Sequence, residues 1–220
     1  MNQDSRKERA ARAALEFIKP GMALGVGTGS TVNFLIDAMD RFRGDLAAVV
    51  ASSRATEARL RARGFTVVEL EQAGDLDLYV DGADEANKHF HLVKGGGGAL
   101  TREKILAAAS RKFVCIIDDS KWVATLGKFP LPVEVIPMAR SWVARQFVRL
   151  RGQPVWRENF VTDNGNQILD VHNLQVTNPP ELESRLNQVP GIVTVGLFAN
   201  RPADVILMAE DTGVRRLDRR

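Results

Sequence analysis

Several features that would narrow the class of protein are scarce in this chain of 220 residues. It has a single cysteine, Cys115, which lies in an apolar run and has no internal disulfide partner. We expect a buried, inert thiol in a cytoplasmic protein. No apolar run approaches the ~20 residues of a membrane span. Residues 1–12 are charged and lack the apolar core of a signal peptide. The sequence therefore predicts a cytoplasmic protein without a membrane segment.

The signatures of several kinds of site are missing as well. The net charge is only +3, and the basic residues form no stripe interleaved with aromatic side chains, so we expect no nucleic-acid site. We expect the arginine-rich tail, residues 215–220, to be a solvated end. His89 and His91 have only His172 as a further histidine, which is too few ligands for zinc, so we predict no metal site. There is no Gly-x-Ser-x-Gly elbow.

What the chain does have is an alternation of short apolar runs and helical patterns, which predicts a parallel sheet. A capping box at Ser5 and Glu8 opens the first expected helix, which ends at Pro20. Periodicity and turn signals place strands at 22–26, 46–51, 65–68, 76–80 and 112–117, and helices at 32–39, 56–63 and 101–110.

From Pro130 the expected order changes to β-α-β-β-α-β, the ferredoxin-like arrangement. A last strand candidate at 203–208 is expected to return to the first sheet. The predicted fold class is α/β: a Rossmann-like parallel-sheet catalytic domain (1–129 plus 203–220) with an inserted smaller ferredoxin-like α+β domain (130–202). The inserted elements are strands at 133–136, 155–160, 167–176 and 192–198, with helices at 139–150 and 180–187.

Polar clusters follow four of the expected parallel strands. In an open α/β sheet, ligands bind beyond the carboxyl ends of the strands. Four clusters at one edge, together with a glycine run that precedes the next helix, predict a site there. The clusters are residues 27–31, 52–53, 81–85 and 118–121.

The first cluster, Gly27-Thr28-Gly29-Ser30-Thr31, is a candidate phosphate loop. It offers backbone N–H groups at a helix start and three hydroxyls. The dinucleotide fingerprint fails because Ser30 replaces its third glycine, and no lysine supplies a Walker A motif. The terminal phosphate of a small molecule fits better than NAD or ATP. The alternative is an ordinary glycine-rich turn with a hydroxyl cap.

The other candidates are carboxylates and the run from Lys94 to Gly98. Asp81 and Asp84 could move protons or bind hydroxyls, although a strand-end turn or a Mg²⁺ site would use them too. Lys94 and glycine N–H groups could stabilise an oxyanion, although Lys94 could also be a surface lysine and the run a flexible loop. Glu103 lies in the first turn of its helix, where the helix dipole stabilises an ionised carboxylate. This holds for a structural glutamate as well as for a catalytic one.

Together these motifs resemble ribose-5-phosphate isomerase, type A, over nearly the whole chain. The pairing of residues 81–85 with residues 94–103 is highly specific to that family. One departure is the segment 208–211, where the family has a smaller Gly-Thr turn; we expect it to touch no site residue. Further motifs that carry the resemblance are residues 27–31, 51–53, 127–134, 162–166 and 191–199.

The resemblance implies an aldose–ketose isomerase that interconverts ribose 5-phosphate and ribulose 5-phosphate in the pentose phosphate pathway, without metal or organic cofactor, as a homodimer. It implies that Glu103 is the base, that Asp81 assists ring opening and proton movement, and that Asp84 binds hydroxyls. Lys94 with Gly95, Gly96 and Gly97 would stabilise the enediolate. The substrate would further contact Thr28, Gly29, Ser30, Thr31, Gly82, Ala83, Lys121 and Lys7.

Two other functions stay open at this point. A CoA-transferase would use a glutamate as nucleophile, but the chain looks too short for a separate CoA site. A sugar-phosphate-sensing regulator would bind without reacting, but it normally carries a DNA-binding helix pair, and residues 1–20 supply one helix.

Overall fold

The computed structural model describes residues 2–219. The contacts divide the chain into two compact units: unit 1 (Met1–Ala83, Arg102–Trp122 and Ala203–Arg220) and unit 2 (Asp84–Thr101 and Val123–Pro202). These units differ from the predicted domains at residues 84–101 and 123–129, and the predicted domain boundaries stay a proposal.

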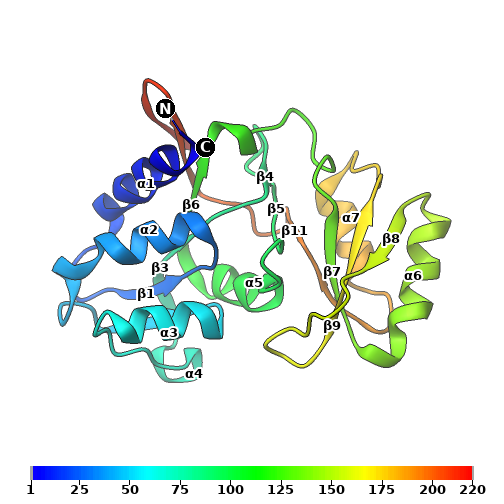
Figure 1. The fold of residues 1–220 in the computed structure, drawn as a ribbon, viewed down its shortest axis with the longest axis horizontal. Helices are drawn as coiled ribbons and strands as arrows, with labels where there is room; N and C mark the ends of the chain where they lie inside the picture. Colours follow the sequence, from blue (N-terminus) through cyan, green and yellow to red (C-terminus); the bar gives the residue numbers. More distant parts are fainter. Residues whose placement is uncertain (1, 220) are drawn as a thin grey trace. The chain divides into compact units, whose positions relative to one another are not determined.

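Unit 1 is built on a mainly parallel sheet of six strands (Figure 1). The last strand pairs antiparallel with its neighbour at the sheet edge, and the other neighbours pair in parallel. From that edge the strands are β13 (Gly213–Asp218), β12 (Val205–Glu210), β6 (Ser110–Asp118), β3 (Leu76–Asp81), β1 (Ala23–Val26) and β2 (Ala48–Ala51).

Helices bury apolar faces against this sheet. Ala10, Ala11 and Ala14 are small and fully buried, so helix α1 (Gln3–Ala14) packs closely on α2 (Ser30–Ala38). Leu60 of α3 (Arg54–Ala62) joins the same core as strand residues such as Val80. The remaining helices here are α4 (Leu70–Ala73), the part of α5 (Leu100–Ala108) from Arg102 onward, and the 3₁₀ turns η1 (Leu15–Phe17), η2 (Asp40–Phe42) and η3 (Asp119–Lys121).

Unit 2 contains the ferredoxin-like arrangement. Its four-stranded antiparallel sheet has the order β10 (Ile192–Val195), β7 (Leu131–Val135), β9 (Gln167–His172) and β8 (Gln153–Trp156). Helices α6 (Arg140–Arg149) and α7 (Pro179–Leu186) give the chain order β-α-β-β-α-β, and η4 (Pro137–Ala139) precedes α6. A second small sheet has the order β11 (Leu197–Phe198), β5 (Leu92–Val93) and β4 (Glu85–Ala86). The predicted α/β fold with a smaller α+β insertion is confirmed.

Three local predictions were wrong. Helix α1 is capped by Asn2, whose Oδ1 accepts the N–H of Ser5 at 2.8 Å, and not by a Ser5–Glu8 capping box. Residues 65–68 form only a bridge between Val49 and Val67. The basic tail is not merely a solvated end, because β13 pairs along the whole of β12.

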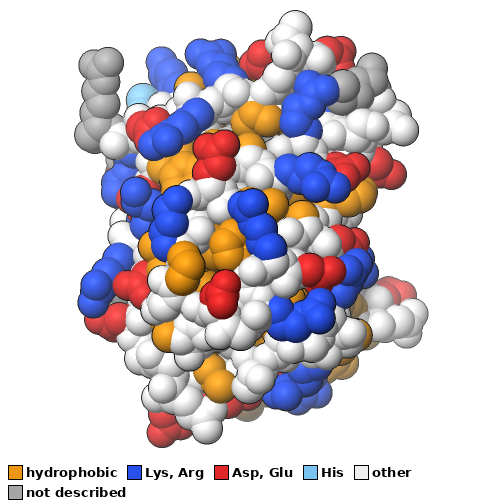
Figure 2. Space-filling view, turned by 90° about the vertical axis from the view of Figure 1, so that its left-hand side faces the viewer, with side chains coloured by type: hydrophobic (Ala, Val, Ile, Leu, Met, Phe, Trp, Pro, Cys, Tyr) orange, Lys and Arg blue, Asp and Glu red, His pale blue; other side chains and the backbone are white. Residues whose placement is uncertain are grey.

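One prediction from composition agrees with the structure. Cys115 is buried in β6. In the described part of the chain, every helix is too short or too polar to cross a membrane. On the face seen in Figure 2, lysine and arginine side chains are interspersed with aspartate and glutamate.

Candidate active site

Asp81 ends strand β3 and is fully buried. Its Oδ1 accepts the N–H of Thr28 at 3.1 Å and the N–H of Gly82 at 2.7 Å. A Cβ added to Gly27 would lie 2.0 Å from the Asp81 carboxyl carbon, so no other residue fits there without moving Asp81. The candidate phosphate loop and the first candidate carboxylate are therefore joined in unit 1.

Tyr79 is a partner of this carboxylate that the sequence analysis missed. Its hydroxyl donates to Asp81 Oδ2, two residues along the same face of β3. Burial raises the pKa of Tyr79 well above its usual value, and the negative charges of Asp81 and Glu103 and the hydrogen bond to Asp81 raise it further. Tyr79 therefore stays a protonated donor. It is the one tyrosine in the sequence, and this scarcity was the signal that could have drawn attention to Tyr79.

Glu103 lies in the first turn of α5, as predicted, and its side chain is almost completely buried. Its charge acts on Tyr79 together with that of Asp81. Unit 1 thus gathers two buried carboxylates around one phenol. Carboxylates beside a protonated donor are suited to moving protons between carbon and oxygen atoms.

The residues of the candidate phosphate loop lie in two different environments, one facing the protein and one exposed. Thr28 Oγ1 lies 2.8 Å from the hydroxyls of both Ser52 and Ser53, so it faces the protein. Gly29 and Ser30 are exposed at the start of α2, and no side chain in the described structure caps this helix. Anions bind favourably at such helix starts, where N–H groups lack intrahelical partners.

The two predicted lysines of unit 1 lie on different elements. Lys121 is the last residue of η3, directly after β6, and is partly exposed. Lys7 lies on α1; its side chain is 15% exposed and its Nζ is 3.3 Å from Asp4 Oδ1. Helix α1 packs against β6.

In unit 2, Asp84 and the glycine run contact each other. Asp84 Oδ2 accepts the N–H of Gly96 at 2.8 Å, and a Cβ on Gly96 would lie 2.6 Å from Asp84 Oδ1. The absence of a side chain is what allows this approach. Lys94 is buried, so it is not the surface lysine of the alternative interpretation, and its Nζ lies 5.6 Å from the centre of the Phe198 ring.

Arg157, which follows β8, organises the glycine run and was also missed. Its guanidinium donates to the carbonyl oxygens of Gly95 and Gly96, each at 3.2 Å. The same group forms an ion pair with Asp170 at 2.6 Å. No local signal reveals this contact, because Arg157 lies about sixty residues further along the chain.

Glu134 of β7 is a third feature that the sequence analysis did not interpret. It is fully buried and accepts hydrogen bonds from the hydroxyl of Thr162 at 2.9 Å and the amides of Asn164 and Asn166 at 3.1 and 2.8 Å. The hydroxyl of Thr101, the second residue of α5, donates to it as well. Two motifs quoted above, 127–134 and 162–166, are therefore parts of one hydrogen-bond network.

His89 and His91 have ring centres 5.7 Å apart. Within residues 2–219, no three or more histidine, cysteine, aspartate or glutamate side chains form a group suited to a metal ion.

Comparison with known proteins identifies close relatives. Residues 48–213 match the profile of the family described as ribose 5-phosphate isomerase A (phosphoriboisomerase A). Ribose-5-phosphate isomerase A from Francisella tularensis subsp. novicida (strain U112) is 59% identical over 208 residues, which is 94% of this chain and 93% of the relative.

Two solved structures are similar over 98% or more of their length. Ribose 5-phosphate isomerase A from Neisseria gonorrhoeae superimposes with a TM-score of 0.96 at 41% identity, covering 100% of this chain and 98% of that one. A D-ribose-5-phosphate isomerase in complex with phospho-erythronic acid gives a TM-score of 0.94 at 33% identity, covering 100% of both chains.

Proposed function

The chain belongs to the ribose-5-phosphate isomerase A family, and from that premise we infer that it interconverts D-ribose 5-phosphate and D-ribulose 5-phosphate. The observation that carries this inference is the 59% identity to a ribose-5-phosphate isomerase A over 94% of the chain. Family membership favours the isomerase over the CoA-transferase and the regulator.

We propose that Glu103 is the base. It takes the proton from carbon 2 of the open-chain aldose, and the electrons move toward the carbonyl oxygen on carbon 1 to give an enediolate. Returning the proton to carbon 1 gives the ketose. One carboxylate on one face of the substrate can do both, and Glu103 is an almost completely buried carboxylate.

We propose that Asp81 moves the oxygen-bound protons, in ring opening and between the oxygens of carbons 1 and 2. Three donors support this assignment, because the N–H groups of Thr28 and Gly82 and the hydroxyl of Tyr79 fix the carboxylate in one orientation. A fixed carboxylate needs no reorganisation at the moment of transfer. Gly82 and Ala83, which follow it, are proposed to contact substrate.

In unit 2, Asp84 is proposed to bind substrate hydroxyls, and Lys94 with Gly95, Gly96 and Gly97 to stabilise the enediolate charge. The hydrogen bond between Gly96 and Asp84 supports a joint action of these two elements. The clamp of Arg157 on Gly95 and Gly96 favours a preformed arrangement of the run, which is how fixed dipoles stabilise developing charge.

The phosphate is proposed to bind the loop of Thr28, Gly29, Ser30 and Thr31, with Lys121 and Lys7 adding positive charge. The exposed start of α2 supports this site. The ligand of the solved relative, phospho-erythronic acid, is a phosphorylated four-carbon acid. Its phosphate and carboxylate match the two charges expected of the enediolate intermediate.

The reaction is proposed to need no metal or organic cofactor, because Lys94 and the backbone N–H groups can supply the positive charge that an enediolate requires. The chain is also proposed to act in the cytoplasm and to form a homodimer, as the family resemblance implies. Sedimentation of the purified protein tests the dimer: a single species with the mass of one chain would contradict it.

The substitution Glu103→Gln tests the assigned base. We expect it to keep substrate binding and to lower kcat by about a thousandfold or more, because an amide cannot accept the proton. Glu71→Gln is the matched control: Glu71 is exposed on α4, and its variant should retain wild-type kcat. Near-normal turnover by Glu103→Gln would exclude Glu103 as the base.

A further inference from the structure

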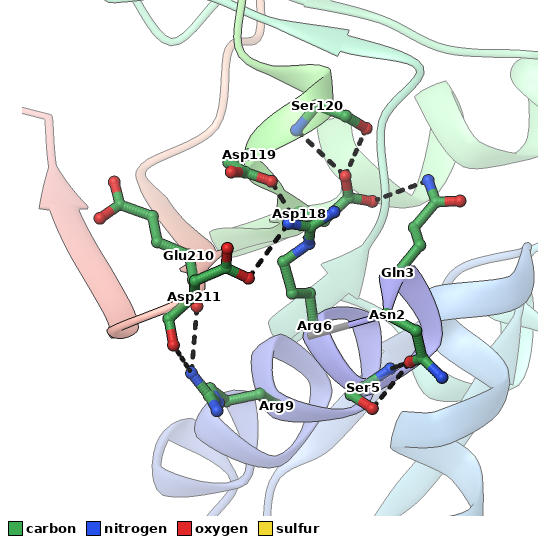
Figure 3. A network of polar contacts seen from close by, with 10 residues as sticks. All are labelled: Asn2, Gln3, Ser5, Arg6, Arg9, Asp118, Asp119, Ser120, Glu210 and Asp211. Atoms are coloured by element: carbon green, nitrogen blue, oxygen red, sulfur yellow. Dashed lines mark hydrogen bonds and ion pairs between the residues drawn. The ribbon is translucent and has the colours of Figure 1, made fainter.

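Arg6 of helix α1 contacts carboxylates from two separate loops of unit 1 (Figure 3). Its Nε lies 3.5 Å from Asp119 Oδ1, and its Nη1 donates to Asp211 Oδ1 at 3.2 Å. The Arg6 side chain is 20% exposed, and the side chains of Asp119 and Asp211 are 43% and 63% exposed, so solvent reaches both pairs. Arg6 therefore connects three elements that are distant in sequence.

The two loops are neighbours because their strands are. Strands β6 and β12 are parallel partners, with Asp118 opposite Ala209, so the chain leaves both at the same edge. After β6 comes η3, and its cap Asp118 accepts the N–H and the hydroxyl of Ser120. Asp119, the partner of Arg6, is the first residue of η3, and Lys121 is the last.

A second arginine holds the turn after β12 to the same helix. Arg9 donates to the carbonyl oxygens of Glu210 and Asp211 at 3.0 and 3.2 Å. This turn belongs to the segment 208–211, which departs from the family pattern and which we expected to touch no site residue. It contacts Arg6 and Arg9, which were not among the predicted site residues; Arg6 directly precedes Lys7 on α1.

We propose that Arg6 is a positioning residue that sets the affinity for the substrate phosphate by holding η3, and with it Lys121, against α1, which carries Lys7. This inference rests on the proposed function, because it takes Lys121 and Lys7 as phosphate ligands. A lysine has a flexible stem and is placed mainly by its backbone. Without Arg6, η3 loses its ion pair with α1 and keeps the long hydrogen bond from Gln3 Nε2 to its cap, Asp118 Oδ2, at 3.5 Å. The Asp119 carboxylate then becomes a competing partner for Lys121.

The test is Arg6→Ala, assayed with ribose 5-phosphate and with inorganic phosphate as a competitive inhibitor. We expect KM and the phosphate inhibition constant to rise together by about fivefold, the size of an ordinary coupling between contacting charges, with kcat within about twofold. Arg12→Ala is the matched control. Arg12 lies on the same helix but pairs with Glu8, so neither constant should change.

A folded Arg6→Ala with unchanged KM and phosphate constant would overturn the proposal, as would a loss of kcat at unchanged phosphate affinity. If this variant does not fold, Asp119→Asn and Asp211→Asn each remove one of the two pairs, and smaller rises in the same two constants are expected. Unchanged constants in both would again overturn it.

Combination with Lys121→Ala separates positioning from general weakening. If Arg6 acts through Lys121, adding Arg6→Ala to Lys121→Ala raises the phosphate constant by less than it does in the wild type. Full additivity would contradict the proposal. Calorimetric titration with inorganic phosphate measures the role of Arg6 in phosphate binding without relying on catalysis. A wild-type protein that binds phosphate but does not convert ribose 5-phosphate would refute the proposed function and leave the proposal for Arg6 standing.

Discussion

At the scale of single residues, the buried carboxylates are distinguished by the donors that surround them. Asp81 accepts two backbone N–H groups and one phenol, and Glu85 accepts the N–H groups of Gly127 and Phe129 at 2.7 and 2.6 Å. Glu134 accepts hydroxyls and amides. Buried charge is tolerated when hydrogen bonds replace its hydration, so each carboxylate also fixes the loop that supplies its donors.

Tyr79 gives a prediction at this scale. Its pKa is raised in the folded protein, mainly by burial, and is about 10 in the unfolded chain. The neutral phenol therefore contributes stability that is fully present below pH ~10 and is lost as the pH rises toward the folded pKa. Above pH ~10, the free energy of unfolding should fall more steeply for the wild type than for Tyr79→Phe, by about 1.4 kcal/mol per pH unit.

The tyrosinate absorbance measures the same group directly, because the sequence contains one tyrosine. We expect the native protein to titrate well above pH 10 and the denatured protein near pH 10. Equal midpoints in the two states would contradict the burial and charge assigned to Tyr79.

At the scale of elements, the loop 162–166 and the start of α5 are held by one side chain of β7. Glu134→Ala removes the acceptor and leaves the donors of Thr101, Thr162, Asn164 and Asn166 without it. Thr162 is buried and the other three donors are partly or fully exposed. Because an unsatisfied buried donor is costly, we expect the free energy of unfolding to fall by about 3 kcal/mol.

Denaturant unfolding measures this loss, with Glu158→Ala as the control. Glu158 is exposed in the same unit, and its removal should change stability by less than about 0.5 kcal/mol. An equally small effect of Glu134→Ala would show that the network does not stabilise the fold.

Elements with strong local patterns could be predicted from the sequence, and those defined by distant partners could not. Residues 113–117 form a continuous apolar run and lie in β6. By contrast, β13 is a polar edge strand that is defined by its pairing with β12. Strands β4 and β5 have two residues each, which is too short for a local pattern. The Ser5–Glu8 prediction failed because Asn2 competes for the same N–H group.

The candidate site was predictable to the same degree. Asp81, Asp84, Lys94 and Glu103 stand in short motifs whose residue types indicate chemistry, so the sequence alone predicts them as site residues, and their roles stay predictions. Tyr79, Arg157 and Glu134 act through contacts that the fold creates, as between Arg157 and Gly95. Their roles required coordinates.

At the scale of the whole molecule, the family match over residues 48–213 shows a ribose 5-phosphate isomerase A, and the chain is divided into two compact units. The residues proposed for the reaction come from both units, with Glu103 and Asp81 in one and Asp84 and Lys94 in the other.

The most direct test of this account is the incubation of ribose 5-phosphate with the wild-type protein in deuterium oxide containing EDTA. The account predicts that ribulose 5-phosphate forms and carries solvent deuterium on carbon 1, because the enediolate is protonated there by a base that exchanges with solvent. Failure to form the ketose, or its formation only after a metal ion is restored, would contradict the proposed function.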